Sequence, residues 1–306
     1  MLFLLYLIIK PADVTAHVLS GLTLCYKVLI PTLFPFLIVS RLLAESSAFV
    51  TLSRMIEIPA RVLFGVSGRY AASLILGSIV GFPSGAKAVS DAYLSGDRSP
   101  ESKQMAEKTL AFCNNCGITF VISAAGVAVL GSVTAGWLLF FVQTTAAILT
   151  GILINIICPP AVIPPSESDY TNGGKVVTTS LSKIISDAMT NLLYICGVVL
   201  FFSLIIHAAA DFLYAPDFIK YAIASVLEVS SGVYSVSGIF SDPRIAFVAM
   251  SATLAWSGVS VHLQVAYAVK ESELSQKLYF TGKAIHVIIS VGLSCLLAFT
   301  FLPSAW

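Results

Sequence analysis

The sequence predicts an all-α membrane protein that crosses the bilayer several times. Of its 306 residues, 57% are hydrophobic and 11% are charged, and the mean hydropathy is +0.92. Soluble domains do not have this balance. The apolar residues also fall into several runs, and a helix of ~20 apolar residues is long enough to cross a bilayer. The net charge of +1 gives no indication of nucleic-acid binding.

The cysteines indicate neither a disulfide framework nor a metal site. All six lie in or beside apolar segments, at Cys25, Cys113, Cys116, Cys158, Cys196 and Cys295. In such places cysteine packs as a small hydrophobic residue. Cys113 and Cys116 match C-x-x-C by spacing, but no second ligand pair accompanies them. We therefore expect no metal, no cofactor and no redox chemistry.

Residues 1–27 are predicted to form a short apolar and interfacial segment. Met1–Ile9 is apolar but too short to cross a bilayer. Ala12–Tyr26 is moderately amphipathic, like helices that lie in the membrane interface. Val28–Leu43 is the first predicted span, and Pro31 and Pro35 within it predict a bend.

Ala71–Ser95 is predicted to be a broken, re-entrant hairpin with its tip at a binding site. The break is Gly81-Phe-Pro-Ser-Gly-Ala-Lys87, in which proline lacks an N–H, glycine loosens the backbone and lysine adds a charge. In lipid, such a break survives where it faces protein or water. The alternative is a proline-kinked spanning helix whose Lys87 reaches the surface. Small residues recur every four positions, at Ser73, Gly77, Gly81 and Gly85. This spacing predicts close helix contact.

The rest of the chain follows a plan that occurs twice. In the first half, Asn114, Asn115 and Gly117 interrupt the span Thr109–Leu130, and Ala135–Cys158 is uninterrupted. The second half is predicted to contain a span, a segment broken at Glu228-Val-Ser-Ser-Gly232, and two more spans, over Ile184–Ala210, Tyr221–Phe240, Ile245–Val269 and Leu278–Leu302. The span Ile245–Val269 carries the polar stretch that ends at Gln264 and is predicted to be interrupted in the same way as Thr109–Leu130.

Short matches indicate that the two halves are repeats. Two pairs of short segments align in sequence: Thr109-Leu-Ala-Phe-Cys-Asn114 with Thr253-Leu-Ala-Trp-Ser-Gly258, and Pro83-Ser-Gly85 with Ser230-Ser-Gly232. We therefore predict a first repeat over residues 28–158, a cytoplasmic linker over 159–180 and a second repeat over 181–302.

The basic residues predict that the repeats are inverted. If both broken segments enter and leave on one side, one face carries Arg41, Arg54, Arg61, Arg69, Arg98, Lys103, Lys108, Lys175, Lys183, Lys270, Lys277 and Lys283. The other face carries Lys10, Lys27, Lys220 and Arg244, and Lys87 lies in the membrane. The crowded face is cytoplasmic by the positive-inside rule. Each half then crosses three times, so the halves are inverted, as in many transporters.

Five motifs together resemble the YlbJ-type sporulation integral membrane proteins of the nucleoside recognition, or Gate-domain, family. They are Pro31-Thr-Leu-Phe-Pro-Phe36, Gly81-Phe-Pro-Ser-Gly-Ala-Lys87, Phe112-Cys-Asn-Asn115, Glu228-Val-Ser-Ser-Gly232 and Ser257-Gly-Val-Ser-Val-His-Leu-Gln264. The resemblance covers about Leu24 to Phe301. It implies two Gate repeats like those of concentrative nucleoside transporters, each with a re-entrant hairpin. It also implies a role in sporulation, with dipicolinate (pyridine-2,6-dicarboxylate) as the transported solute.

Lys87 is the first candidate for binding such an anion. A buried ammonium needs a partner, and backbone N–H groups near Ser84 and Gly85, at the start of a half-helix, would add to an anion site. Alternatively, Lys87 pairs with Glu228. Asp91, one helical turn beyond Lys87, is a further partner of opposite charge.

Glu228 is predicted either to couple transport to H⁺ or Na⁺ or to cap a helix end. Neutral donors and acceptors complete the predicted substrate site, at Asn114, Asn115, Ser230, Ser231, Ser260, His262 and Gln264. These polar residues could instead hold helices together.

The sequence thus predicts a non-enzymatic transporter in a bacterial cell membrane, the outer forespore membrane if the host sporulates, with basic loops in the cytoplasm. A homo-oligomer is compatible with it. A non-transporting scaffold or sensor, a nucleoside transporter and a passive channel are alternatives. A Ser84–Lys87 dyad would suit an intramembrane enzyme, but no G-x-S-x-G or H-E-x-x-H motif accompanies it.

Overall fold

The computed structural model describes residues 2–44, 46–160, 180–213 and 216–301, and these residues form helices and connecting turns without strands. The helices of the first half are α1 (Leu2–Ile9), α2 (Pro11–Leu24), η1 (Cys25–Leu29), α3 (Ile30–Ala44), α4 (Ser47–Met55), α5 (Glu57–Phe64), α6 (Gly68–Ile79), α7 (Ser84–Leu94), α8 (Pro100–Cys113), η2 (Phe120–Val129) and α9 (Val133–Ile157). Those of the second half are α11 (Leu181–Leu213), α12 (Asp217–Leu227), α13 (Val229–Ser235), η3 (Val236–Gly238), α14 (Pro243–Trp256), α15 (Gly258–Ala268), η4 (Lys270–Ser272) and α16 (Lys277–Phe301).

Among the described residues, four helical segments are long and apolar enough to cross a membrane: Val133–Ile157, Leu181–Ala209, Pro243–Ala268 and Lys277–Thr300. The helices α5 and α6, bent by 90°, make a fifth if they count as one span. The prediction of an all-α membrane protein is confirmed at this level. Two further predicted spans are each shared between two helices: Val28–Leu43 between η1 and the 15-residue α3, and Thr109–Leu130 between α8 and η2.

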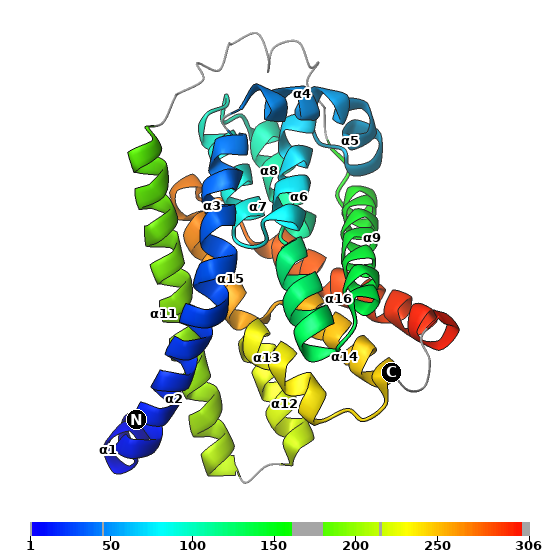
Figure 1. Ribbon diagram of the computed structural model, residues 1–306. Helices are drawn as coiled ribbons and strands as arrows, with labels where there is room; N and C mark the ends of the chain where they lie inside the picture. Colours follow the sequence, from blue (N-terminus) through cyan, green and yellow to red (C-terminus); the bar gives the residue numbers. More distant parts are fainter. Residues whose placement is uncertain (1, 45, 161–179, 214–215, 302–306) are drawn as a thin grey trace.

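The N-terminal helices α2, η1 and α3 run without a break beside the long helix α11 (Figure 1). Gly21 allows this approach, since a Cβ there would lie 2.7 Å from Leu200. Further along, the Cys25 thiol donates to the carbonyl oxygen of Cys196 over 3.9 Å. The predicted boundary at residue 27 therefore lies inside a continuous helix, at the π-helical turn η1. The predicted interfacial helix packs one face against α11, and most of its other described residues are exposed.

Two helical hairpins lie toward opposite ends of the molecule (Figure 1). One consists of α6 and α7, which pack together and turn at the predicted break, where Gly81 has φ of 96°. The other consists of α12 and α13, which turn at Glu228. The turns of both hairpins line one cavity, described below.

Two of the remaining helices are interrupted, as the polar residues within them predicted. Helix α8 ends at Cys113, and an irregular segment at residues 114–117 precedes η2. Helix α14 ends at Ser257, where φ is 73°, and Gly258 with φ of 82° begins α15. Such left-handed backbone angles end an α-helix.

The predicted strip of small residues produces the closest packing between α6, α7 and α8. A Cβ on Gly77 would lie 1.8 Å from the carbonyl oxygen of Cys113, and one on Gly85 would lie 2.2 Å from the same atom. Both glycines therefore bring their helices against the end of α8 at a distance that no other residue allows.

Gly77→Ala should accordingly destabilise the protein by about 1–3 kcal/mol or more, because a backbone oxygen must move to make room. Gly197→Ala is the matched control, since a Cβ there meets nothing within 4 Å and alanine favours a helix by up to ~1 kcal/mol. Thermal unfolding of the purified variants in detergent measures both. Equal melting temperatures for the wild type and Gly77→Ala would contradict the close packing.

Candidate functional site

A small cavity, which we call the central niche, lies where the turns of the two hairpins meet. Val80, Gly81 and Phe82 line it from the first hairpin, and Glu228 and Ser230 line it from the second. Gln264 and residues of α3, η2 and α11 complete its wall. Its volume is about 50 Å³, which holds a few water molecules but not an aromatic acid.

Glu228 acts as the N-cap of α13. Its buried carboxylate accepts hydrogen bonds from the backbone N–H of Ser230 at 2.9 Å and of Ser231 at 2.6 Å, and from the Ser231 hydroxyl at 2.8 Å. A helix N-terminus presents unpaired N–H groups and a partial positive charge, so a carboxylate satisfies both. The structure thus supports the capping interpretation of Glu228.

Asn114 caps the corresponding helix of the first hairpin from another element. Its Oδ1 atom accepts a hydrogen bond from the backbone N–H of Ala86, in the first turn of α7, at 2.9 Å. The break in α8 therefore positions the tip of the first hairpin, just as Glu228 positions the tip of the second.

Several other predicted site residues are buried with an unsatisfied polar atom. Among the described residues, the atoms Asn115 Oδ1, Ser260 Oγ, His262 Nε2 and Gln264 Oε1 have no hydrogen-bond partner. The second ring nitrogen of His262, Nδ1, is 2.7 Å from the Tyr279 hydroxyl. Buried polar atoms usually have a partner, so these four have the capacity to bind water or a polar solute.

A second, much larger cavity of about 760 Å³, the charged cavity, opens beside the first hairpin. It contains two of the predicted site residues, Ser84 and Lys87. Its charged lining comes from both halves of the chain: Arg41, Lys87, Asp91, Lys183, Asp187, Lys270 and Glu271.

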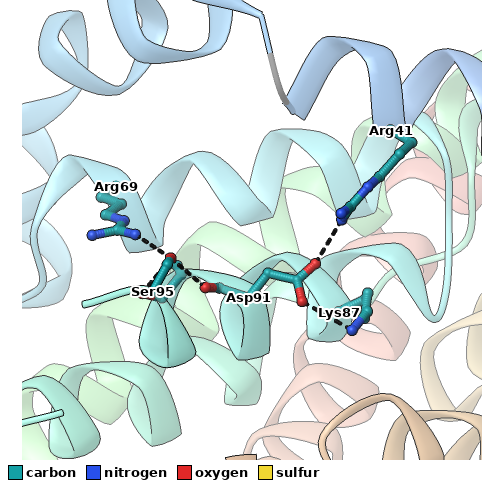
Figure 2. Close-up of polar contacts among 6 residues, drawn as sticks. Arg41, Arg69, Lys87, Asp91 and Ser95 are labelled. Carbon is teal, nitrogen blue, oxygen red and sulfur yellow. Dashed lines mark hydrogen bonds and ion pairs between the residues drawn. The ribbon is translucent and has the colours of Figure 1, made fainter. Parts of the chain in front are cut away.

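Asp91 joins two of the cations in this cavity (Figure 2). Its carboxylate lies 2.9 Å from Arg41 Nη1 and 2.9 Å from Lys87 Nζ. The Lys87 side chain is 44% exposed. Lys87 is therefore not deeply buried, and the predicted pair with Glu228 does not form. Its partner is Asp91, one turn along the same helix, which the i,i+4 spacing had also indicated.

Sequence reasoning missed Lys283, which it counted among the basic residues of the cytoplasmic face. The residue lies in α16 and is 2% exposed. Its Nζ atom donates to the carbonyl oxygen of Asn114 at 2.7 Å and to the Ser257 hydroxyl at 3.0 Å. A lone lysine within the apolar run Leu278–Leu302 was the signal that could have found it.

The structure thus divides the predicted site. Ser84 and Lys87 face the charged cavity, and Glu228, Ser230 and Gln264 face the central niche. The others lie buried between helices or within a cap: Gly85, Asn114, Asn115, Ser231, Ser260 and His262.

The sequence is similar to that of one curated protein. The chain is 23% identical over 299 residues to the sporulation integral membrane protein YlbJ of Bacillus subtilis. The alignment covers 86% of this chain and 72% of that protein. This match supports the resemblance that the motifs predicted. No family model matches the chain, and no solved structure matches it significantly.

Glu228→Ala should lower stability by about 1–2 kcal/mol, the usual effect of removing an N-cap. Glu228→Gln should cost less, because the amide oxygen still accepts one N–H. Glu271→Ala removes an exposed carboxylate and serves as the control. Thermal unfolding separates the three; a Glu228→Ala protein as stable as the wild type would mean that the cap is dispensable.

Proposed function

We propose that the protein transports a small anionic solute across a bacterial membrane, with an aromatic dicarboxylate such as dipicolinate as the first substrate to test. The observation that carries the proposal is the charged cavity. Its volume of about 760 Å³ lies in the range of small-molecule sites. Its lining has one more cationic than acidic side chain, which favours an anion.

The shared carboxylate of Asp91 suggests how a dianion would bind. Arg41 from α3 and Lys87 from α7 both point to Asp91 (Figure 2). One carboxylate of the solute would replace Asp91 as the partner of Arg41 or Lys87. The second carboxylate would reach Lys183 or Lys270 on the second half of the chain. A bound dicarboxylate would in this way draw the two halves together.

The difference between the two cavities supports alternating access. The charged cavity has room for a solute, whereas the central niche has room only for water in this conformation. We propose that the halves are inverted repeats, that the basic side is cytoplasmic, and that solute passes between the hairpin tips when they separate. Hairpins that approach each other from opposite ends are compatible with such a movement.

Coupling to protons would act through the cap of α13. A protonated Glu228 would accept the N–H groups of Ser230 and Ser231 less strongly, and the tip of the second hairpin would loosen. We propose that this loosening is the coupling step. The hydrogen bonds that the Glu228 carboxylate accepts from Ser230 and Ser231 all belong to the cap, so protonation would weaken all of them.

The relative is a sporulation integral membrane protein, and this suggests a role in spore formation and in the membranes around the forespore. A nucleoside is a poorer substrate candidate, because it has no charge to match the excess of cations. A membrane scaffold or sensor would need neither the solute-sized cavity nor its charged lining.

Uptake of radiolabelled dipicolinate into proteoliposomes tests the proposal. The wild type should accumulate the solute, and Lys87→Ala should reduce uptake at low substrate by about tenfold or more, the effect of losing a charge-assisted hydrogen bond. Lys220→Ala, which removes a partly exposed lysine paired with Asp217 at 3.1 Å, should leave uptake unchanged. A wild type that accumulates no dipicolinate or other aromatic acid would instead favour a scaffold or sensor.

Asp91→Asn should have the opposite effect on binding. It removes the carboxylate that Arg41 and Lys87 share, and each partly exposed ion pair is worth about 0.2–1 kcal/mol. The dissociation constant for dipicolinate should therefore fall about two- to fivefold. Isothermal titration in detergent measures it, and weaker binding by the variant would exclude the exchange of carboxylates.

A further inference from the structure

Lys283 lies between the two interrupted helices. Its ammonium has three oxygen neighbours: the carbonyl oxygen of Asn114 at 2.7 Å, the Ser257 hydroxyl at 3.0 Å and the carbonyl oxygen of Ala255 at 3.4 Å. One comes from the end of α8 and two from the end of α14. An ammonium has three hydrogens to donate, so each oxygen can accept one.

The surroundings balance the charge of Lys283 without an acid. Among the described residues, no carboxylate forms an ion pair with Lys283. The C-terminus of a helix carries about half a negative elementary charge on its unpaired carbonyl groups. Two such ends converge here, so together they supply about the one negative charge that a lysine requires.

The chain is built to bring these groups together. Gly282 lets α16 approach α8, since a Cβ there would lie 2.2 Å from the carbonyl oxygen of Ala111. The left-handed Ser257 ends α14 beside the same point. The two breaks also touch directly, because the Cys116 thiol donates to the carbonyl oxygen of Leu254 over 3.6 Å.

We propose that the ends of α8 and α14 form a cation site and that Lys283 fills it as a tethered cation. Unwound carbonyl groups and half-helix C-termini are the ligands with which membrane transporters hold a free Na⁺. In this protein the same kind of oxygen set holds a side-chain ammonium. As far as the proposed transport function holds, no Na⁺ is then needed at this position, in contrast to the Na⁺ coupling that the sequence allowed.

Lys283→Ala should leave the oxygen site vacant, and a small free cation should fill it. In choline chloride we expect the melting temperature of the detergent-purified variant to fall by the order of 5–10 °C. Methylammonium or Na⁺ at the same ionic strength should restore part of this loss with saturation, whereas choline is too large to enter. The wild type should melt at the same temperature in all three salts.

Lys283→Met is the matched control, since it removes the charge but fills the space. It should be destabilised without recovery in any salt. If Lys283→Ala cannot be purified, Lys283→Ser leaves the same vacancy and should show the same recovery. A vacant-site variant that melts alike in choline, methylammonium and Na⁺ would overturn the proposal.

Transport gives a separate readout. Uptake by the wild type should be the same when choline replaces Na⁺ on both sides of the membrane. Uptake that requires Na⁺ would contradict the proposal that Lys283 takes the place of a coupling Na⁺. If no solute is taken up at all, the proposed function fails, but the melting experiment still decides whether the cation site exists.

Discussion

The constraint on which the structure depends is that a helix interrupted inside a membrane must satisfy its free backbone groups from within the protein. Four helix ends meet near the middle of this molecule, and each has a defined partner. Carbonyl groups at the ends of α8 and α14 accept hydrogen bonds from Lys283. N–H groups at the starts of α7 and α13 donate to Asn114 and Glu228. Partners are divided by charge: a cation serves the C-termini and oxygen acceptors serve the N-termini, as the direction of the helix dipole requires.

These contacts link elements that would otherwise be independent. Asn114 takes part in two of them, since its side chain caps α7 while its backbone carbonyl accepts from Lys283. The position of the first hairpin is therefore coupled, through one residue, to α16 and to the break in α14. A movement of the hairpin tip that opened the central niche would have to release or carry along this set of contacts. Because Gly77 and Gly85 pack closely on Cys113, we expect α6, α7 and the end of α8 to move as one unit.

The charged residues have two different tasks in this arrangement. Lys283 is buried and held by backbone and hydroxyl oxygens, so its charge is already balanced. Arg41 and Lys87 are partly exposed in a large cavity and share Asp91, which a solute could replace at modest cost. A polar residue in a membrane protein therefore cannot be assigned to substrate binding by its type alone; its exposure and its present partners decide which task it can perform.

The sequence by itself determined the class of the protein and where its helices break. Pro83 lacks an N–H, Gly81 adopts a positive φ, and the polar residues after Cys113 and Trp256 interrupt apolar runs; these are local effects that neighbours in sequence encode. It also restricted Glu228 to capping or coupling. Only the tertiary structure decided the partners. Lys283 and Asn114 are separated by 169 positions in the sequence. The residues next to Lys283 therefore do not indicate whether its side chain faces two helix ends or the membrane surface. Which groups meet depends on how α8, α14 and α16 pack together, because a buried charge takes its partners from whichever elements surround it.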